Sequence, residues 1–463
     1  MIVMKFGGSS VESAAALDRV TSIIAAHLPR KPVVVVSAMG KTTNRLLELG
    51  ELAAEGQREE ALEKLRQLHA YHLREADPVV PPSRRHELER VVLSHFEELE
   101  ELVKGLSILG ELTPRSKDAI ASYGERLSSQ ILTLACSSRN IRATHIDARE
   151  VIVTDSRFTQ ASPIYPQTYA RLQERIPPLL QENDAVVLGG FIGANEQGVT
   201  TTLGRGGSDF SASIVGAGLN AEEIQIWTDV DGMLTADPRV LPGGLRVKTI
   251  SFAEAAELAY FGAKVLHPST VLPAIEKNIP VLILNSRRPE VGGTRIVRES
   301  VPSRTIAKAI ACKSNITLVN IQSTRMLMAY GFLRRIFEVF DRFETSVDMI
   351  ATSEVSVSLT IDNPAQLDAI TGELAQFSDV TVEKDQAIVC LVGENIRYTP
   401  GVAARVFGAL NQINIRMISQ GASLLNLGFV VAQADLPATV AALHQEFFSN
   451  PDPAVFEPAA GAA

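Results

Sequence analysis

The apolar and polar positions of the chain fall into blocks that alternate between strand-like and helix-like spacing. A short apolar run at Met1–Lys5 is followed by helical spacing over 11–28 and by a continuous β-branched run at 33–36. Strands that are apolar on both faces are typical of a parallel sheet covered by helices on both sides. We therefore expect a strand, a glycine turn, a helix and a second, buried strand at the start of the chain.

The pattern changes over residues 45–110, where apolar stripes at helical spacing are separated by many Glu, Arg and Lys residues. One stripe is formed by Leu62, Leu65, Leu68 and His72. Such a stripe with a charged opposite face predicts an amphipathic helix. We interpret 45–110 as a helical insertion that is exposed on one side.

From about residue 110 to 300, strand and helix patterns alternate again, which predicts an α/β sandwich. The expected strands are 143–147, 185–188, 223–228 and 279–284, and the expected helices are 208–219, 253–261 and 269–276. Beyond 300, the order strand, helix, two strands, helix occurs twice, and a glycine (Gly331 or Gly401) opens the first helix of each copy. We interpret this as an internal duplication of an α+β unit of about 70 residues.

Composition and charge narrow the function classes. At 463 residues the chain is long enough for two or three domains, and its net charge of −9 argues against a nucleic-acid partner. No apolar run reaches the ~18 residues of a membrane span. Cys136, Cys312 and Cys390 are too widely spaced for a disulfide framework or a metal knuckle. With no apolar signal segment after Met1, we expect a cytoplasmic protein that binds neither nucleic acid nor membrane.

Two glycine-rich segments carry the candidate chemistry. Lys5–Ser10 (KFGGSS) ends the first apolar run, and Gly204–Asp209 (GRGGSD) follows a later one. Glycines let backbone N–H groups approach an anion closely, and the start of a helix adds a favourable dipole. Lys5 and Arg205 can neutralise phosphate or carboxylate. A site that holds two anions together is what a kinase acting on an acid requires.

Other nucleotide and metal motifs fail. Gly40–Thr43 resembles the end of a P-loop, but the required first glycine would stand at Val35. The glycines of 216–218 lie late in an expected helix, which excludes a dinucleotide fingerprint. His69 and His72 lack Cys or carboxylate partners at ligand spacing, and we expect them on the surface of the insertion.

Glycine turns remain at the ends of predicted strands, at 5–8, 37–40, 189–191, 204–209 and 228–232. Open α/β sheets bind their ligands at the carboxyl ends of the strands. One such turn alone is more often structural than functional. Five at successive strand ends predict a ligand site.

These segments together resemble the aspartate kinases, or aspartokinases, of the amino-acid kinase family. The matching segments are 5–11 (KFGGSSV), 36–44 (VSAMGKTTN), 122–127 (SYGERL), 200–209 (TTTLGRGGSD), 227–232 (WTDVDG) and 261–268 (FGAKVLHP). The resemblance runs from residue 1 to about 450, and the duplicated C-terminal units resemble paired ACT domains. It implies an α/β three-layer sandwich around a mainly parallel sheet, followed by two ferredoxin-like α+β ACT domains.

The resemblance also implies domain bounds and an activity. A catalytic domain is expected at 1–295, with its helical insertion at about 45–110, and ACT domains are expected at 310–384 and 385–455. The implied reaction moves the γ-phosphoryl group of ATP, bound with Mg²⁺, to the β-carboxylate of L-aspartate. It is the first step of lysine, threonine and methionine biosynthesis. The ACT domains imply feedback inhibition by lysine or threonine, and a homodimer or larger homo-oligomer.

The residues agree with this chemistry. A side-chain carboxyl group of pKa ~3.9 is ionised at neutral pH and needs no general base. The obstacle is repulsion between a carboxylate and a triphosphate, and phosphoryl transfer depends mainly on positioning and charge neutralisation. We therefore expect many cations and N–H donors and no catalytic histidine. Mg²⁺ is expected to be held mostly by phosphate oxygens and water, and we name no protein ligand for it.

The resemblance implies roles for individual residues. Lys5 is expected to span the β- and γ-phosphates, Arg205 to grip a substrate carboxylate and Glu125 to receive the substrate's α-ammonium group. Asp209 is expected to orient Lys5 or to face the Mg²⁺–phosphate region, unless it is only a first-turn helix carboxylate. The other expected substrate-binding residues are Ser37, Thr43, Gly206, Gly207 and Ser208.

Two further sets of residues follow from the same resemblance. The expected nucleotide-binding residues are Lys5, Phe6, Gly7, Gly8, Thr228, Asp229, Leu234, Arg239, Lys264 and Val265. Among them, Gly7 and Gly8 are expected to donate backbone N–H groups, and Leu234 stands where related kinases often have Tyr. The expected effector-binding residues are Met326, Gly331, Phe332, Leu333, Val347, Asp348, Thr352, Ser353 and Glu354.

Alternatives remain open for the effector and for the exact activity. Asp348 and Glu354 can receive ammonium groups, but Ala329 and Tyr330 differ from one lysine-sensitive subgroup, so lysine and threonine both stay open. A kinase of glutamate or of an acetylated amino acid is a second candidate, and a degenerate kinase serving as a sensor is a third. Glu125 favours a substrate with a free ammonium group, and the intact charged residues argue against a degenerate site.

Overall fold

The computed structural model describes residues 1–262, 266–299, 302–323 and 330–459. The chain forms two compact units, of which the first comprises Met1–Gly232 and Leu266–Glu299 and the second comprises Met233–Val265 and Ser300–Ala463. The segment 233–265 therefore packs with the C-terminal part of the chain, although in sequence it lies between the two parts of the first unit. Three residues of the predicted sites, Lys264, Val265 and Met326, lie outside the described residues.

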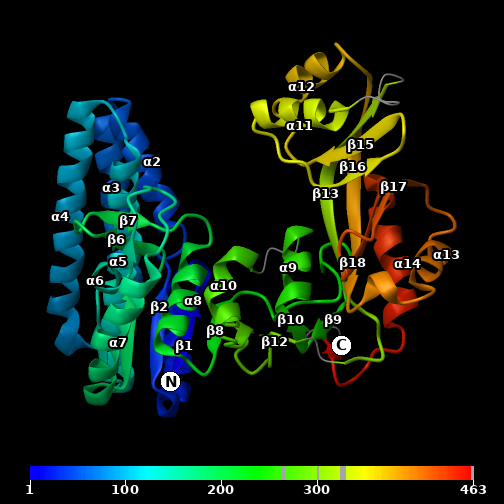
Figure 1. The fold of residues 1–463 in the computed structure, drawn as a ribbon. Coiled ribbons are helices and arrows are strands. Elements are labelled where there is room, and N and C mark those ends of the chain that lie inside the picture. The colour runs from blue at the N-terminus through cyan, green and yellow to red at the C-terminus, as the bar shows by residue number, and fades with distance from the viewer. Residues whose placement is uncertain (263–265, 300–301, 324–329, 460–463) are drawn as a thin grey trace. The chain divides into compact units, whose positions relative to one another are not determined.

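A mainly parallel sheet forms the centre of the first unit, with strands in the order β12-β11-β8-β1-β2-β5-β3 (Figure 1). Neighbouring strands are parallel except β12, which is antiparallel to β11. Every residue of β2 is buried, as expected of a central strand. The bounds are β1 Ile2–Phe6, β2 Pro32–Val36, β3 Ala143–His145, β5 Ala185–Gly189, β8 Ile224–Thr228, β11 Val281–Asn285 and β12 Thr294–Val297.

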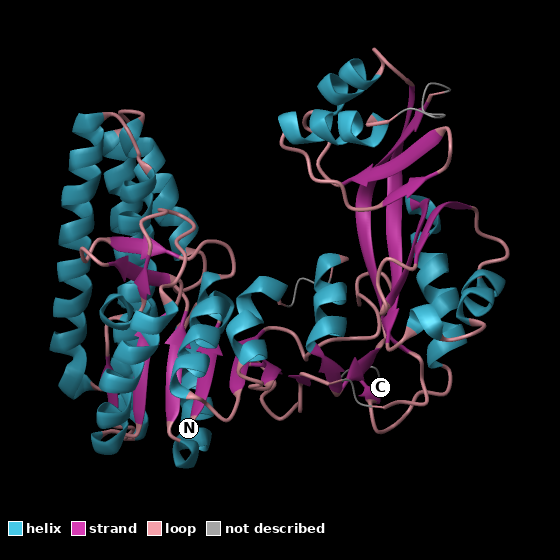
Figure 2. Ribbon diagram, in the orientation of Figure 1, coloured by secondary structure: helices cyan, strands magenta, loops and turns pink. Residues whose placement is uncertain are grey.

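Helices cover both faces of this sheet, as Figure 2 shows. Because side chains alternate along a strand, Met4 and Phe6 of β1 enter the core formed with α1 and α5. Val3 and Lys5 face the opposite side, where α8 packs. The predicted three-layer α/β sandwich is confirmed. The helices are α1 Ala14–His27, α5 Pro114–Cys136, α6 Ala148–Val151, α7 Tyr165–Glu182, α8 Gly207–Leu219 and α10 Leu272–Glu276.

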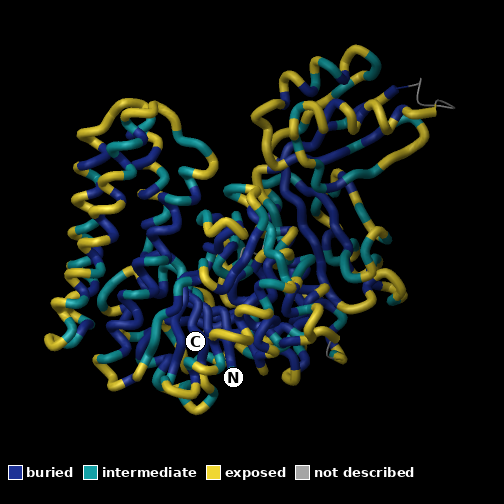
Figure 3. The backbone as a smooth tube through the Cα atoms, turned by 60° about the vertical axis from the view of Figure 1, so that its left-hand side comes forward, coloured by how far each residue is buried: buried dark blue, intermediate teal, exposed yellow. Residues whose placement is uncertain are grey.

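Residues 42–109 form three long helices, α2 Thr42–Ala54, α3 Arg58–Ala76 and α4 Arg85–Leu109. Helices α3 and α4 lie side by side, and buried and exposed turns alternate along them (Figure 3). This pattern confirms the amphipathic helices predicted there. A small separate sheet is formed by β4 Val153–Thr154, β6 Ile192–Asn195 and β7 Thr200–Thr202.

The surface position predicted for His72 is wrong. Its side chain is fully buried on α3, in line with Leu62, Leu65 and Leu68. Both ring nitrogens have partners there, since Nδ1 lies 2.8 Å from the carbonyl oxygen of Leu68 and Nε2 lies 3.4 Å from the hydroxyl of Thr42. Burial lowers the pKa of His72 to about 4, so the ring is neutral at pH 7.

The second unit contains the predicted duplication, as β13-α11-β14-β15-α12 and β16-α13-β17-β18-α14. The long strands β13 and β16 pair antiparallel, so the two copies share one sheet in the order β14-β15-β13-β16-β18-β17. This confirms the two C-terminal α+β domains. The strands are β13 Ala307–Gln322, β14 Ile350–Thr352, β15 Ser356–Ile361, β16 Asp379–Gly393, β17 Ile415–Gln420 and β18 Asn426–Ala432. The helices are α11 Phe332–Arg342, α12 Leu367–Leu374, α13 Val402–Ala409 and α14 Leu436–Phe448.

The segment 233–265 contributes β9 Leu245–Val247, β10 Thr249–Ser251 and α9 Phe252–Tyr260 to the second unit. Strand β9 pairs with the C-terminal strand β19, Phe456–Pro458. On α9, Glu257 accepts hydrogen bonds from the hydroxyl of Ser423 at 2.6 Å and the amide of Asn426 at 2.7 Å. Side-chain hydrogen bonds as well as strand pairing thus bind this segment to the C-terminal domains.

Across the ranges that the structure describes, no helix is both long and apolar enough to traverse a membrane. The three cysteines are free, and two of them, Cys136 and Cys390, are buried. The cytoplasmic location stays a prediction.

Candidate active site

The glycine turns that follow β1, β2 and β5 meet at one edge of the parallel sheet. Together with α5 and the start of α8 they enclose a pocket of about 390 Å³. Predicted residues that line this pocket are Lys5, Gly8, Ser37, Thr43, Glu125, Arg205, Gly206, Gly207, Ser208 and Asp209. The two predicted cations, Lys5 and Arg205, therefore line a single pocket.

Some lining residues lay in the motifs but had no predicted role: Ala38, Gly40, Asn44, Phe191 and Gly204. Asn44 adds an amide next to the hydroxyl of Thr43. Phe191 has a positive φ of 65°, an uncommon conformation for a bulky residue, and its amide donates to the hydroxyl of Ser211 at 2.9 Å. Their position in or next to the glycine-containing segments 37–44, 189–191 and 204–209 was the signal that could have found them.

Lys5 forms an ion pair with Asp209 inside the pocket. Its Nζ lies 2.6 Å from Oδ1 of Asp209, and the two side chains are only 11% and 18% exposed. Asp209 lies in the first turn of α8, where a carboxylate also interacts favourably with the helix dipole. The pair fixes the ammonium group of Lys5 at the end of β1 and offsets its charge.

Two glycines are required by the shape of the pocket wall. A Cβ atom on Gly8 would lie 2.8 Å from the carbonyl oxygen of Gly40, so no side chain fits there. Gly206 has a φ of 72° and begins α8 in the left-handed conformation that glycine adopts without strain. In the first turn of α8 the amide of Gly207 donates to the carbonyl oxygen of Gly204 at 3.0 Å, and Ser208 and Asp209, which follow it, line the pocket at the N-terminal end of the helix.

The donor role predicted for the amide of Gly7 is wrong. Its N–H already donates to the carbonyl oxygen of Trp227 at 3.2 Å and so continues the pairing between β1 and β8. Phe6 is also turned away from the pocket, because it is fully buried against Trp227 on the other face of the sheet. Of the predicted glycine donors, only Gly8 lines the pocket.

Glu125 brings a buried carboxyl group into the pocket from α5. Its Oε1 accepts a hydrogen bond from the amide of Ala38 at 3.2 Å, and its buried Oε2 has no partner among the described residues. Burial raises the pKa of Glu125 to about 8, although the hydrogen bonds and the charge of Lys5 act in the opposite direction. The group is therefore mostly protonated at pH 7, and it receives a cation only in its ionised form, which becomes the main form above pH 8.

Arg205 is exposed, and its guanidinium group has no partner among the residues that the structure describes. The pocket therefore offers one cation already paired, one unpaired cation, a carboxyl group lacking a partner, and several hydroxyl and amide donors. Such a set suits a small ligand that carries both negative and positive groups and lies next to a second anion.

The other predicted nucleotide residues do not line this pocket. Thr228 and Asp229 follow β8, with the hydroxyl of Thr228 donating to Asp229 at 3.3 Å. Leu234 and Arg239 belong to the second unit, where Arg239 pairs with Asp237 at 2.6 Å. Thr228 and Asp229 thus belong to the first unit, Leu234 and Arg239 belong to the second, and Lys264 and Val265 lie outside the described residues.

The predicted effector residues lie around α11 and β14 in the second unit. Gly331 begins α11 with a φ of 79°, Phe332 is buried, and Leu333 is exposed. Asp348 already contacts an ammonium group, because its Oδ1 accepts from Nζ of Lys313 at 2.7 Å, and Asp362 accepts from the same Nζ at 2.6 Å. Thr352, Ser353 and Glu354 are exposed.

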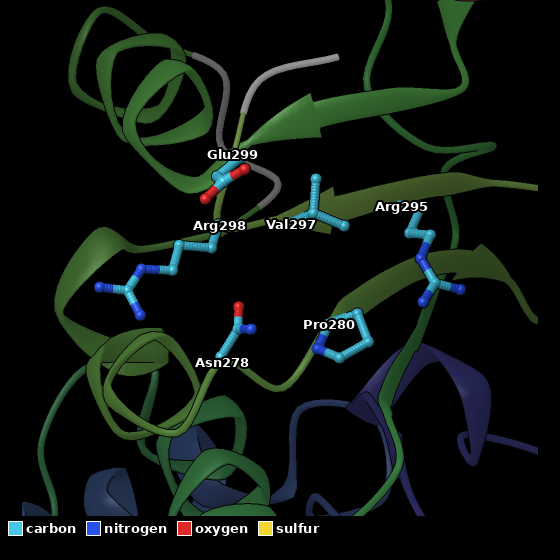
Figure 4. Close-up of a pocket in the computed structure, with 6 residues that line it drawn as sticks. All are labelled: Asn278, Pro280, Arg295, Val297, Arg298 and Glu299. Atoms are coloured by element: carbon cyan, nitrogen blue, oxygen red, sulfur yellow. The ribbon is translucent and has the colours of Figure 1, made fainter.

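A second cavity of about 430 Å³ in the first unit is lined by Asn278, Pro280, Arg295, Val297, Arg298 and Glu299. The guanidinium groups of Arg295 and Arg298 lie well apart, on opposite sides of the view in Figure 4. They do not converge on one anion, and Glu299 adds a negative charge. No predicted site residue lines this cavity. Within the described ranges, no group of three or more His, Cys, Asp or Glu side chains is placed to hold a metal ion.

The layered first unit, with a cation-bearing glycine pocket at the carboxyl ends of its strands, is that of a phosphoryl-transferring enzyme of the amino-acid kinase type. The model of the amino acid kinase family matches residues 1–285, and an ACT domain model matches residues 389–447. The chain is 40% identical to aspartokinase 1, chloroplastic, of Arabidopsis thaliana, over 97% of this chain and 80% of that protein.

Solved structures of aspartokinases are similar to this chain as well. Escherichia coli aspartokinase III in complex with lysine and aspartate, in the T-state, has a TM-score of 0.83 at 37% identity, covering 97% of this chain and 99% of that one. The same enzyme in complex with aspartate and ADP, in the R-state, has a TM-score of 0.78 at 36% identity, covering 97% and 100%. The chain belongs to the aspartokinases, the ATP-dependent aspartate kinases of the amino acid kinase family.

Proposed function

We propose that the protein transfers the γ-phosphoryl group of ATP to the β-carboxylate of L-aspartate, giving 4-phospho-L-aspartate and ADP. The observation that carries this proposal is that Lys5, Arg205 and Glu125 line one pocket. Glu125 supplies a partner for the α-ammonium group of aspartate. Arg205, whose planar fork suits a carboxylate, supplies a partner for one of its negative groups.

Charge neutralisation is the main task of the site. Aspartate and ATP repel each other, and Lys5, held by Asp209, is the cation positioned to span the β- and γ-phosphates. The N–H groups of Gly8 and of the first turn of α8 add donors for phosphate oxygens. Ser37, Thr43, Gly206, Gly207 and Ser208 complete the wall around the amino acid.

The transfer step balances without a general base. An oxygen of the ionised β-carboxylate forms a bond to the γ-phosphorus, while the bond from that phosphorus to the β–γ bridging oxygen breaks and its electron pair leaves with ADP. No proton moves. Mg²⁺ bound to the phosphates offsets negative charge on them, held mostly by phosphate oxygens and water. The remaining nucleotide contacts are assigned to Thr228, Asp229, Leu234, Arg239, Lys264 and Val265.

Regulation is part of the proposal. The second unit senses an end-product amino acid, with lysine favoured and threonine possible, in the enzyme that opens the lysine, threonine and methionine pathway. Lysine is favoured because the E. coli enzyme was solved with lysine bound. The catalytic domain is assigned to 1–295 and the ACT domains to 310–384 and 385–455, and the protein is assigned a homodimeric or larger homo-oligomeric state.

Trapping of the acyl phosphate tests the reaction. Purified protein is incubated with ATP, Mg²⁺ and L-aspartate in the presence of hydroxylamine, which converts the product to aspartyl hydroxamate. L-glutamate and N-acetyl-L-glutamate serve as competing substrates, and a Lys5→Met variant serves as the control for contaminating kinases. Hydroxamate formed from aspartate alone is the expected result. Its absence without added effector and at every lysine and threonine concentration would leave only the sensor function.

A further inference from the structure

Asp118 is a buried carboxylate that the reaction described above does not use. It lies on α5, two helical turns before Glu125, and its residue is only 1% exposed. It does not line the pocket. Among the described residues no cation pairs with it, so it is not half of a buried ion pair.

Three donors from two other segments converge on this carboxylate. The hydroxyl of Thr202 donates to Oδ1 at 2.6 Å, and the amide of Thr202 donates to Oδ2 at 3.0 Å. The amide of Thr159 lies within 3.0 Å of both oxygens, at 3.0 and 2.9 Å. A carboxylate accepts all of these bonds. The NH₂ group of an asparagine would instead force the Thr202 hydroxyl to turn and accept, and it would face the Thr159 amide, which lies close to both oxygens.

One of these segments leads into the loop that carries Arg205, and the other packs against it. Thr202 is the last residue of β7, and Gly204, Arg205 and Gly206 follow after one residue. The carbonyl oxygen of Thr159 lies 3.3 Å from where a Cβ of Gly204 would stand, so the backbone at Thr159 is in close contact with the backbone at Gly204. The amide of Ala161 also donates to the carbonyl oxygen of Thr202 at 2.9 Å.

Thr159 adopts a conformation that needs outside support. Its φ is 72°, in the left-handed region that β-branched residues rarely occupy. Such strain persists only where surrounding groups fix it, and the double acceptor at Asp118 is positioned to do so. A carboxylate close to an anion-binding pocket opposes ligand binding electrostatically. The support that Asp118 gives to the backbone at Thr159 and Thr202 offsets this cost.

We propose that Asp118 is a positioning residue of the substrate site, which fixes Thr159 and Thr202 so that the Gly204–Gly206 loop presents Arg205 to the carboxylate of aspartate. This role rests on the proposed function for the assignment of Arg205 to aspartate. Because Arg205 has no side-chain partner in the part of the chain that the structure describes, the backbone on both sides of it is what determines its direction.

Steady-state kinetics of Asp118→Asn test this role. We expect the KM for aspartate to rise at least tenfold, while kcat and the KM for ATP change less than about threefold. Thr159→Gly removes the strain, so we expect the double variant Asp118→Asn/Thr159→Gly to recover part of the lost aspartate affinity. A KM for aspartate within twofold of wild type, or an equal rise in both KM values, would overturn the proposal.

A second pair of variants covers the case in which Asp118→Asn does not fold. Thr202→Val removes one donor and is expected to raise the KM for aspartate, whereas Thr202→Ser keeps the hydroxyl and is expected to leave it unchanged. Equal values for these two variants would contradict the role of the hydrogen bond.

Limited trypsin digestion gives a readout that does not depend on activity. Arg205 is exposed, so a loosened loop is cleaved faster after it, and mass spectrometry of native digests measures that rate. We expect faster cleavage after Arg205 in Asp118→Asn than in wild type. Unchanged cleavage would overturn the positioning role. If wild type forms no aspartyl hydroxamate, the proposed function fails, whereas the digestion still reports whether Asp118 holds the loop.

Discussion

Two lysine–carboxylate pairs in this molecule have nearly the same geometry and very different surroundings. In the first unit Lys5 lies 2.6 Å from Asp209, and in the second Lys313 lies 2.7 Å from Asp348. Lys313 has a second carboxylate partner in Asp362, so that group is a triad of one ammonium and two carboxylates. The pair of Lys5 instead lies on a pocket wall with Arg205 and Glu125, whose charged groups have no full partner among the described residues.

The comparison teaches that an ion pair alone does not define a site. What marks the pocket of the first unit is the set of groups left unmatched beside the pair, together with backbone too close-packed for side chains. The triad around Lys313 sets two carboxylates against one ammonium group, and the buried Oδ2 of Asp348 has no hydrogen-bond partner among the described residues. It can therefore receive a further ammonium group, but it offers no cation for an anion. The predictions below test this difference, in order of decreasing expected effect.

Replacement of Lys5 is expected to have the largest effect. We expect Lys5→Met to lower kcat by about 100-fold or more, the size seen when one preorganised electrostatic donor is removed. Lys313→Met is the matched control, and its kcat without effector is expected to stay within a few-fold of wild type. Hydroxamate assays at saturating ATP and aspartate measure both values. Equal losses in the two variants would erase the distinction between the two pairs.

Replacement of Arg205 is expected to act on one substrate. Arg205→Ala removes charge-assisted hydrogen bonds to a carboxylate, worth about 1.5–3 kcal/mol, which corresponds to a rise of roughly 10- to 100-fold in the KM for aspartate. The KM for ATP is expected to change far less. Initial rates with each substrate varied in turn provide the measurement, and unaltered aspartate kinetics would remove Arg205 from the substrate site.

The raised pKa of Glu125 predicts that the KM for aspartate depends on pH. Its pKa of about 8 lies above the ordinary value, so the carboxyl group is protonated at pH 6 and loses its proton as pH rises through 8. An ammonium group needs the ionised form, and apparent affinity scales with the fraction in that form. The KM for aspartate should therefore fall by about tenfold between pH 6 and 7, by about fivefold between pH 7 and 8, and then level off.

Glu125→Gln is the control for this profile. We expect it to raise the KM for aspartate and to abolish the dependence on pH in that range, because the amide does not titrate. A flat profile in wild type would show that Glu125 does not receive the ammonium group of the substrate.

Replacement of Asp348 is expected to have the smallest effect on the uninhibited enzyme. We expect Asp348→Ala to change kcat and both KM values less than about twofold but to relieve inhibition by lysine, because a carboxylate that faces ammonium groups is lost. Rates measured against lysine and, separately, threonine test this. Inhibition equal to wild type would dissociate Asp348 from the effector site.

Much of the fold could be predicted because its strands are short, apolar and closed by glycine turns. The pattern at 33–36 identified a central strand, and the order of elements after 300 identified the duplication. The pairing of segment 233–265 with the C-terminal domains could not be predicted. Its strand and helix pattern continues that of the first unit, and only tertiary contacts such as those of Glu257 assign it elsewhere.

The candidate site was predictable to the level of side chains but not of backbone hydrogen bonds. Lys5, Glu125 and Arg205 stand out as charged residues beside glycines or within a matching motif. The use of the Gly7 amide in pairing with Trp227 depends on the register of β1 with β8, which the sequence does not contain. His72 did carry a signal, because it continued a stripe of leucines, and polarity alone argued for the surface.

The excursion of residues 233–265 into the second unit has a consequence for engineering. A stop codon after Glu299 would retain all residues matched by the amino acid kinase model, yet it would remove Ser423, Asn426 and the other neighbours of α9. Phe252 and Leu258, now buried, would face water. A truncation at this point therefore does not yield an intact first part of the chain. A variant without feedback inhibition is better sought by point substitution.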